Sequence, residues 1–507
     1  MALSTSSVAF IFVATSITIC IAIIVLYTKW KFLYWVRVGL PMLHPTFFFG
    51  NMKDILLGRC SEGDFYYECY KKFKSNGFKH GGVYMFLHPV YVPTDLKIIK
   101  HILKNDFEHF TNRTTYLNEE GDPLSENMFR MHDDKWKNLR TKLTRNFSPN
   151  KLNLMFPSLL DCAEDLKTVV DEAAIKRVPV DVKEVLGRFC VDVFGETALG
   201  LQWEVLKNPQ SDINNYCKNF FDSNGFRMMK IMLAEILPKS LLCAIKFKLA
   251  GTDLEQFFIK LIDRVINYRE KNNTRREDFL QLLLQMKNNS SVHEKPLNLN
   301  QVTAQVFAFF LAVFEAPSSM ITFALYELAN NFKIQEKVKE EINSVLSKHG
   351  GQLTYKTIAE MKYLDKVLQE TVRKHPVGRI LQRKCNSDYT IPNTSIRLKK
   401  GVSVKISIVG VHYDPEYYPN PEKFDPERFS NKNKEGRPDI AWLGFGKGQR
   451  MCLGLRFAMV LGKLALCVLL ENYKITLNTK TKVPIQLDVK KFFSYVEGGV
   501  WLDFEKV

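Results

Sequence analysis

Twenty consecutive residues near the N-terminus, Val8 to Tyr27, carry no charged side chain. About twenty helical residues cover the hydrocarbon core of a bilayer, and only a helix or a closed barrel satisfies its backbone hydrogen bonds there. The run ends in the basic and aromatic sequence Tyr27–Lys31, which is typical of a membrane interface. A cleaved signal peptide, the alternative, would have a shorter apolar stretch and a cleavage site of small residues. We therefore expect an uncleaved membrane anchor over residues 1–31.

This apolar run is followed by the basic residues Lys29, Lys31 and Arg37, and no Lys or Arg precedes it. Because positively charged flanks tend to stay on the cytosolic side of a membrane, the rest of the chain is expected in the cytosol. Prolines within residues 32–50 predict a stiff hinge. No long Gly/Ser-rich or Pro-rich linker divides residues 51–507, so we expect one large domain there.

The net charge of +17 favours partners that carry negative charge, such as a membrane surface or an acidic protein. The Lys and Arg residues are dispersed and no nucleic-acid-binding motif is present, which argues against nucleic acid. The ten cysteines are irregularly spaced and form no Cys-x-x-Cys pair. This spacing argues against a disulfide framework or a zinc site and favours a reducing compartment.

Apolar residues at three- and four-residue spacing predict helices in the middle of the chain: Lys151–Val170, Asp181–Leu201, Leu254–Glu270, Leu297–Asn331 and Lys333–Ser347. Short β-like runs flank these helices at Val83–Val92, Tyr389–Leu398 and Val402–Val411. A further β-like run lies near the C-terminus. The expected fold is mainly α with small β sheets. The apolar and basic segment Phe226–Ala250 either dips into the bilayer surface or forms ordinary core helices.

The stretch Phe445–Gly454 reads Phe-Gly-Lys-Gly-Gln-Arg-Met-Cys-Leu-Gly. A cysteine is usually an inert core residue, but five positions of this stretch form one pattern: Phe445, Gly448, Arg450, Cys452 and Gly454. Chance would produce that combination on the order of once in a thousand chains of this length. The stretch resembles the haem-ligand loop of cytochromes P-450.

Physical chemistry explains each residue type in this loop. Cys452 would be the axial thiolate of haem b, and the first turn of the apolar helix that follows would lower its pKa. Gly448 and Gly454 would permit tight turns and close backbone approach. Phe445 would shield the sulfur from water, and Arg450 would pair with a haem propionate.

Three residues elsewhere resemble the family's structural charge network behind the haem: Glu370, Arg373 and Arg428. The first two, in Glu-Thr-Val-Arg, share one helix face, and the third lies in Pro-Glu-Arg-Phe. Three more residues resemble the family's contacts to the haem propionates: Trp136, Arg140 and Arg113. The resemblance thus implies a cytochrome P-450 fold, a single large domain after the anchor.

Further segments look like insect microsomal members, a branch known for oxidising plant toxins and insecticides: Pro45–Met52, Asp278–Leu282 and Thr322–Leu328. The resemblance implies insertion of one atom of O₂ into a lipophilic small molecule, whether a xenobiotic or an endogenous lipid. Electrons would come from NADPH through a cytochrome reductase, because no convincing dinucleotide or flavin signature is present. Basic residues around the loop (Lys447 and Arg456) would suit an acidic reductase. The implied location is the endoplasmic reticulum membrane.

The sequence departs from the family in its oxygen-activating helix, which normally carries Ala-Gly-x-Glu/Asp-Thr-Thr/Ser. Here Val313 replaces the glycine and Ala316 the threonine, while Glu315 keeps the acid and is expected to relay protons. Pro317 cannot donate an N–H and is expected to kink the helix. In the family, the threonine hydroxyl assists proton delivery.

Three hypotheses remain open from these departures. The protein is a monooxygenase in which water or a substrate hydroxyl replaces the threonine, an isomerase or dehydratase that needs no O₂ activation, or a non-catalytic haem protein that binds ligands. Five residues are candidates for walls of a lipophilic pocket or, equally, for ordinary core packing: Phe307, Phe310, Phe314, Ile380 and Phe493.

Overall fold

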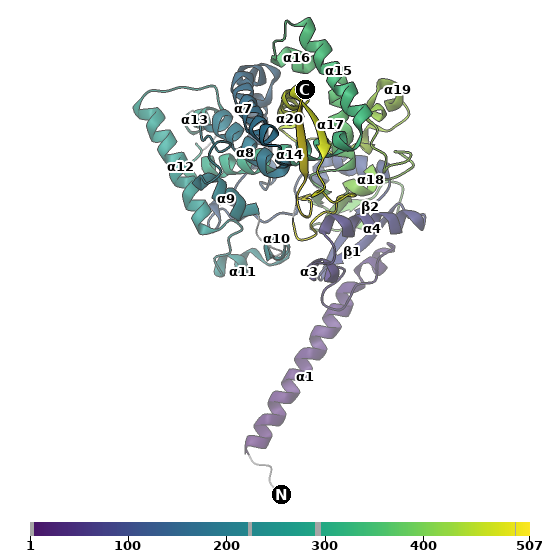
Figure 1. The fold of residues 1–507 in the computed structure, drawn as a ribbon. Helices are drawn as coiled ribbons and strands as arrows, with labels where there is room; N and C mark the ends of the chain where they lie inside the picture. Colours follow the sequence, from purple (N-terminus) through teal and green to yellow (C-terminus); the bar gives the residue numbers. More distant parts are fainter. Residues whose placement is uncertain (1–4, 222–225, 289–295, 492) are drawn as a thin grey trace.

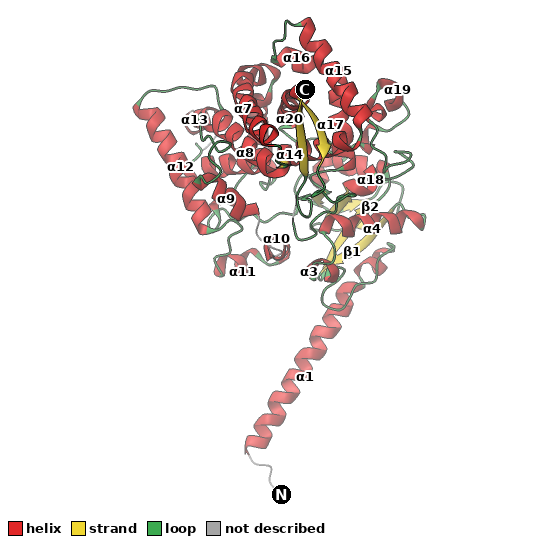
Figure 2. Cartoon of the chain, in the orientation of Figure 1, coloured by secondary structure: helices red, strands yellow, loops and turns green. Residues whose placement is uncertain are grey.

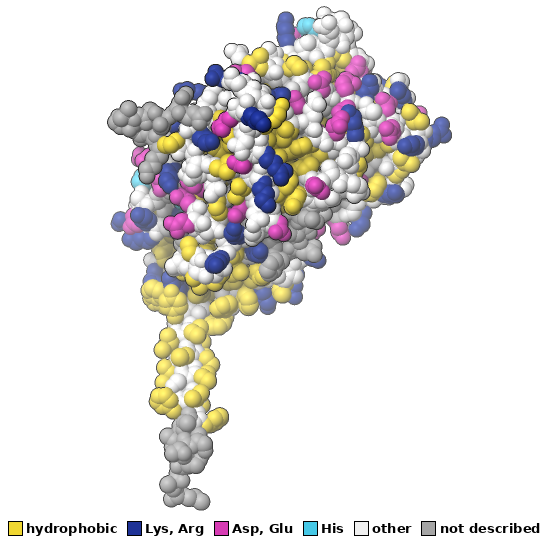
Figure 3. Space-filling model, turned by 90° about the vertical axis from the view of Figure 1, so that its left-hand side faces the viewer, with side chains coloured by type: hydrophobic (Ala, Val, Ile, Leu, Met, Phe, Trp, Pro, Cys, Tyr) yellow, Lys and Arg dark blue, Asp and Glu magenta, His cyan; other side chains and the backbone are white. Residues whose placement is uncertain are grey.

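The computed structural model describes residues 5–221, 226–288, 296–491 and 493–507. Helix α1 (Thr5–Phe32) projects as a rod from a body that holds the other elements (Figure 1). The most apolar part of the candidate span Phe10–Val38 has no buried residue, whereas Phe32 and Trp35 near its end pack against the body. Figure 3 shows hydrophobic side chains on the rod and at the foot of the body beside it. Helix α1 therefore fits a membrane anchor.

Helices dominate the body (Figure 2). The longer ones are α4 (Glu62–Ser75), α6 (Asp133–Thr144), α7 (Pro149–Lys176), α8 (Val182–Phe194), α9 (Asp212–Phe221), α10 (Phe226–Ile236), α12 (Thr252–Lys271), α13 (Phe279–Asn288), α14 (Leu299–Asn330), α15 (Phe332–Lys348), α17 (Lys362–Lys374) and α20 (Leu455–Asn472). The shorter α-helices are α2 (Tyr34–Val38), α3 (Lys53–Leu56), α5 (Leu96–Lys100), α11 (Lys239–Ala244), α16 (Tyr355–Glu360), α18 (Ile408–His412) and α19 (Asn431–Lys434). Single 3-10 or π turns complete the set: His101–Asn105, Phe107–Phe110, Pro123–Ser125, Arg145–Phe147, Gly195–Leu199, Pro426–Phe429 and Asp439–Ala441.

Small sheets lie at the edge of this helical body. The largest has the strand order β1-β2-β7-β4, with β2 and β7 parallel and the other neighbours antiparallel. A second sheet has the order β3-β9-β8, and β5 pairs with β6. The strands are β1 (His80–Met85), β2 (His88–Pro93), β3 (Val180–Asp181), β4 (Ile380–Lys384), β5 (Tyr389–Thr390), β6 (Arg397–Leu398), β7 (Ser403–Ser407), β8 (Tyr473–Leu477) and β9 (Trp501–Lys506).

The predicted helices are confirmed, with ends that differ by up to seven residues, but the three predicted β runs are only partly right. The run Val402–Val411 forms strand β7 only as far as Ser407, and α18 follows at once. The Ser407 hydroxyl accepts a hydrogen bond from the Gly410 N–H at 3.0 Å. This cap starts a helix where the apolar pattern alone suggested a continuing strand. The runs Val83–Val92 and Tyr389–Leu398 are each a hairpin rather than one strand.

Helix α14 is the centre of the core and packs against α8, α12, α17 and α20. Its start is set by a capping box, in which Asn298 and Gln301 bond to each other's backbone N–H. The helix continues without a break through Pro317. Most of its side chains are buried, so this long apolar helix belongs to the core.

Candidate functional site

The loop before α20 is closed by short backbone hydrogen bonds. The N–H of Cys452 donates to the Phe445 carbonyl at 2.8 Å, and the N–H of Gly446 donates to the Leu443 carbonyl at 2.7 Å. Gly448 adopts φ +76°, and a Cβ atom there would lie 1.8 Å from the backbone oxygen of Leu103. The prediction that Gly448 permits a close backbone approach is confirmed.

The same explanation is wrong for Gly454. Its φ is −87°, and a Cβ atom at this position would meet no protein atom closer than the Phe147 ring, 4.0 Å away. The residue that supplies the second left-handed turn is Gly446, with φ +71°. Sequence reasoning missed Gly446, although the Phe-Gly-Lys-Gly spacing could have indicated it.

Gly448→Ala should destabilise the loop by at least about 2 kcal/mol, because a left-handed alanine is strained and its Cβ overlaps backbone that cannot rotate away. Chemical denaturation monitored by circular dichroism would measure the loss. Gly436→Ala is the matched control, since a Cβ at Gly436 meets nothing within 4 Å. Equal stability of the two variants would show that the Leu103 backbone moves aside at little cost.

The Cys452 side chain keeps accessible surface although it lies deep among protein atoms, so this surface faces the interior rather than bulk water. Burial raises the pKa of the Cys452 thiol, and the Gly454 N–H and the guanidinium groups of Arg140 and Arg113 offset this only in part. The helix start and the nearby cations thus lower this pKa as expected, but burial outweighs them in the protein alone. A metal that coordinates a thiol deprotonates it outright.

Guanidinium groups gather around this loop, and they come from distant parts of the chain: Arg113, Arg140, Arg383 and Arg450. Burial followed by repulsion from the other arginines lowers the pKa of Arg450 to about 9 and holds that of Arg113 well below its ordinary value. Burial also lowers the pKa of Arg383 to about 10. The cluster therefore favours an anion beside it.

Arg450 is held from several sides. Its Nε donates to the Thr111 carbonyl at 2.9 Å and its Nη2 to the Met131 carbonyl at 2.7 Å. Its guanidinium carbon lies 3.9 Å from the ring centroid of Trp136, which is buried. Arg113 donates to the Phe129 carbonyl at 2.9 Å. Two of the predicted site residues, Trp136 and Arg450, thus form one stack, which fastens the loop to α6.

Arg383 belongs to this cluster, and sequence reasoning missed it. The side chain is 1% exposed, and its Nε has no hydrogen-bond partner within the described residues. A buried donor without an acceptor is costly, so an acceptor is expected at this position. No local sequence motif identifies Arg383 as a site residue, because the residues that surround it come from other segments.

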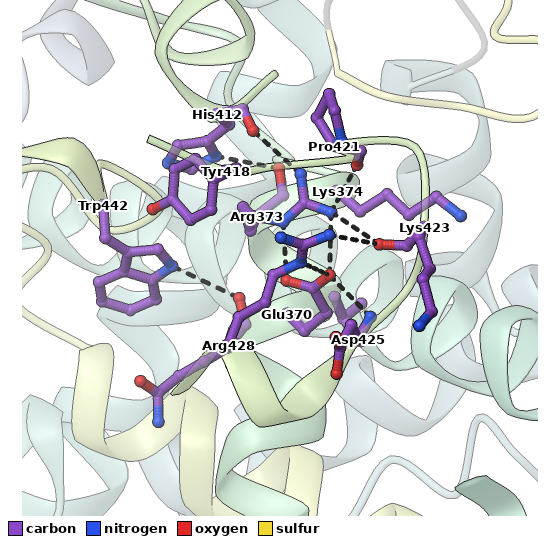
Figure 4. A network of polar contacts seen from close by, with 12 residues as sticks. Glu370, Arg373, Lys374, His412, Tyr418, Pro421, Lys423, Asp425, Arg428 and Trp442 are labelled. Atoms are coloured by element: carbon purple, nitrogen blue, oxygen red, sulfur yellow. Dashed lines mark hydrogen bonds and ion pairs between the residues drawn. The ribbon is translucent and has the colours of Figure 1, made fainter. Parts of the chain in front are cut away.

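Glu370 and Arg373 of α17 form a fully buried ion pair, with Arg373 Nε 2.7 Å and Nη2 2.9 Å from the carboxylate oxygens (Figure 4). The guanidinium also donates to the carbonyls of His412 at 2.9 Å and Pro421 at 2.7 Å. Arg428 Nε lies 3.4 Å from the Glu370 carboxylate. The structure thus brings together the three residues that the sequence grouped.

His412 connects this network to the loop that carries Cys452. Its Nδ1–H donates to the Arg373 carbonyl at 3.0 Å, and its Nε2 accepts the Leu443 N–H at 2.9 Å. An imidazole that donates and accepts in this way must be neutral. Burial, followed by the nearby Arg373 guanidinium, lowers the pKa of His412 to about 3. His412 was not singled out from the sequence, because nothing local marks its two partners.

Stability should therefore fall in mild acid. The unfolded chain protonates His412 below about pH 6.5, whereas the folded protein resists protonation down to about pH 3, so the stabilisation present above pH 6.5 is lost as the pH falls. Between pH 7 and pH 5 the wild type should lose about 2 kcal/mol more than His412→Gln, measured by urea unfolding at each pH. Parallel losses in both proteins would contradict this assignment.

The Cytochrome P-450 family model matches residues 40–497 of the chain. A probable cytochrome P-450 of Drosophila melanogaster, 6a23, is 36% identical over 97% of this chain and 99% of its own length. Cytochrome P-450 6A1 of Musca domestica is 35% identical over 95% of each chain. The chain belongs to the cytochrome P-450 family. This cytochrome P-450 is thus a haem-thiolate monooxygenase, and its cofactor is haem b.

The residues present fit that cofactor. Haem b carries two propionates, and Cys452 is the one anionic group among the principal described neighbours of Arg113, Arg140 and Arg383. Cys452 would ligate the iron, and its thiolate would supply the electron density that favours O–O cleavage. Phe445 packs against Trp442, with ring centroids 5.8 Å apart, beside the loop.

Glu315 of this cytochrome P-450 is buried and held by three side chains. Lys183 Nζ lies 3.1 Å from its Oε1, the Ser319 hydroxyl donates to Oε1 at 2.7 Å, and the Tyr495 hydroxyl donates to Oε2 at 2.7 Å. Lys183 also donates to the Ser318 and Ser319 hydroxyls at 2.8 Å. Both carboxylate oxygens are therefore occupied. Sequence reasoning found Glu315 but none of these partners.

Phe307, Phe310 and Phe314 of α14 are buried in the core. Phe307 packs on Phe258 at 5.1 Å between centroids, and Phe310 packs on Phe194 at 5.2 Å. Phe314 contacts the position of Gly187 in α8. Of the two alternatives left open for these three residues, their burial favours core packing over pocket walls. Ile380 and Phe493 are only partly buried.

Ala308, Ala312 and Ala316 of α14 recur every four residues and keep accessible surface, as do Phe309 and Leu311 beside them. Val313, in contrast, is buried. The position that carries threonine in the family pattern, Ala316, thus keeps accessible surface, as does Ala312 one turn before it. A uniformly apolar helix gives no sequence signal of which face is accessible.

Proposed function

We propose that this monooxygenase inserts one atom of O₂ into a lipophilic small molecule. The observation that carries the substrate class is the accessible face of α14, where Ala308, Ala312 and Ala316 offer no hydrogen-bonding side chain. A polar substrate would lose its hydrogen bonds to water there without replacement. Insect relatives that match nearly the whole chain support the same class.

We propose the same division of the chain as the sequence suggested: an anchor over residues 1–31, a hinge over 32–50 and a catalytic domain over 51–507. The apolar α1 and the basic residues after it support attachment to the endoplasmic reticulum membrane with the catalytic domain on the cytosolic face. NADPH would supply electrons through a separate cytochrome reductase. Lys447 is already paired with Asp439 at 2.5 Å, so Arg456, which is exposed, is the freer cation for such docking.

Proton delivery in this enzyme would run without the usual threonine. Glu315 could hand a proton only through its partners Ser319, Lys183 or Tyr495, or through water, because Ala316 offers no hydroxyl. A working enzyme with incomplete coupling is the consequence, in which part of the NADPH consumed yields peroxide or water instead of product.

The test reconstitutes the full chain with haem b, an insect cytochrome reductase and NADPH, and supplies lipophilic compounds. A red-shifted ferrous carbonyl band, together with an oxygenated product that requires both NADPH and reductase, would support the proposal. Turnover of hydroperoxides without reductase would instead favour an isomerase or dehydratase activity. NADPH oxidation by the purified chain alone would contradict the need for a reductase.

Ala316→Thr should raise the product formed per NADPH about fivefold, since one added hydrogen bond contributes about 1 kcal/mol. Combination with Val313→Gly should raise it further. Ala308→Thr is the matched control, because it adds the same hydroxyl to the same face two turns earlier. Unchanged coupling in Ala316→Thr with a true substrate would mean that protons reach the site by another route.

A further inference from the structure

A pocket of about 420 Å³ lies where the membrane helix joins the body. Trp30, Lys31, Tyr34 and Arg37 from the end of α1 and from α2 form one wall. The turn between β1 and β2 forms another wall, and the segment 399–403 before β7 closes a third side. Its volume is within the range of sites that bind small molecules.

Positive charge dominates the lining: Lys31, Arg37, Lys384, Lys399 and Lys400. The single acidic residue in the lining, Glu235, is already bound by Lys405, whose Nζ lies 3.3 Å from its carboxylate. Lys399 pairs with Asp388 at 2.8 Å. Within the described ranges the ammonium groups of Lys31, Lys384 and Lys400 form no ion pair. The pocket therefore carries an excess of uncompensated positive charge.

Among the residues that the structure describes, the Arg37 cation pairs only with neutral groups. Its guanidinium donates to the carbonyls of Leu33, at 3.3 Å, and Trp30. It also lies over the Trp30 ring, 4.9 Å from the centroid, and Lys31 lies 5.5 Å from that centroid. These contacts hold the cations around the aromatic ring and leave their charge available to an anion.

The depth of the pocket identifies the source of that anion. The apolar span of α1 ends at the residues that line it, and Trp30 stacks near Tyr27 as in an interfacial aromatic belt. Trp30, Leu33 and Val36 are about half exposed, which places apolar side chains beside the mouth of the pocket. A ligand that combines an anionic headgroup with acyl chains would meet both surfaces at once.

We propose that this pocket binds the headgroup of an anionic phospholipid from the membrane that holds α1. The lysine ammonium groups bind the phosphate and carboxylate of the headgroup, and the acyl chains lie along α1 and α2. The lipid thereby fixes the body against the bilayer at the hinge. This inference rests on the proposed membrane attachment, and the experiment separates the two.

The experiment uses the full chain, loaded with haem b, in neutral detergent micelles. Binding of short-chain phosphatidylserine, short-chain phosphatidylcholine and inorganic phosphate is measured by isothermal titration calorimetry. Lys384→Gln with Lys400→Gln should weaken phosphatidylserine binding by roughly tenfold to thirtyfold, since each lysine near a membrane surface contributes about fivefold. Both lysines are exposed, so folding should be unaffected.

The matched control is Lys432→Gln with Lys434→Gln, which removes the same charge from α19, on the part of the body away from α1 (Figure 1). It should bind phosphatidylserine as the wild type does. Equal loss in both double variants would overturn the pocket as the site. Inorganic phosphate bound as tightly as phosphatidylserine would overturn the lipid as its ligand. Flotation with neutral phosphatidylcholine vesicles tests the α1 anchor alone, and its failure would refute the attachment and not the pocket.

Discussion

Cys452→Ser should abolish the red-shifted Soret band of the ferrous carbonyl complex completely. The band requires a thiolate on the iron, and a serine hydroxyl, with its far higher pKa, cannot replace it. The loop itself should persist in this variant, because its shape depends on Gly446, Gly448 and backbone hydrogen bonds rather than on the sulfur. Haem content and the carbonyl spectrum would be measured on the same sample.

Cys243→Ser provides the control, because Cys243 is an exposed free thiol in α11. That variant should keep the band unchanged. A normal spectrum in Cys452→Ser would exclude Cys452 as the ligand and would remove the basis for the proposed oxygen chemistry.

Lys183→Met should destabilise the protein by about 3–5 kcal/mol, because it leaves the Glu315 carboxylate buried and uncompensated. Glu315 is 1% exposed and the Lys183 side chain 15%, so water cannot replace the lost cation. Most of the cost should disappear in Lys183→Met with Glu315→Gln, since the second change removes the charge that the first leaves unpaired. Denaturant unfolding of the haem-loaded proteins would measure both.

Lys506→Met is the comparison, because Lys506 pairs with Asp171 at a similar 2.9 Å but is 62% exposed. Exposed pairs contribute about 1 kcal/mol or less, so this variant should be nearly neutral. Equal effects of Lys183→Met and Lys506→Met would mean that the Glu315 carboxylate finds another partner. Slower turnover in Glu315→Gln at unchanged stability would support its proton-relay role.

Local patterns explain what could be predicted from the sequence. Helix α14 follows from apolar spacing and from a capping box in adjacent residues, and Gly448 from the need of a loop for a left-handed turn. Glu370 and Arg373 are one helical turn apart, so their pairing is a property of α17 itself. Each of these features is encoded within a few residues.

Features that depend on distant segments could not be predicted in the same way. Lys183 meets Glu315 across 132 positions, and His412 meets Leu443 across 31. Arg383 joins Arg113 and Arg450 only because β4 passes beside the loop. The orientation of Phe307 and Phe310 could not be predicted for another reason. In a helix that is apolar on every side, the hydrophobic pattern does not indicate which face is buried.

Two helices within the described residues, α1 and α14, are long and apolar enough to cross a membrane, yet only α1 extends outside the body. During synthesis at a translocon both segments would be presented for insertion before the body has folded. A charged side chain near the middle of an apolar segment costs about 3 kcal/mol on insertion, and Glu315 lies at that place in α14. The carboxylate that Lys183 neutralises in the folded protein would therefore oppose insertion of this segment during synthesis. A variant that replaces Lys183 and Glu315 with apolar residues would keep an apolar core. It would lose the charge that opposes membrane insertion of α14, so the variant would be impaired in membrane topology rather than in stability.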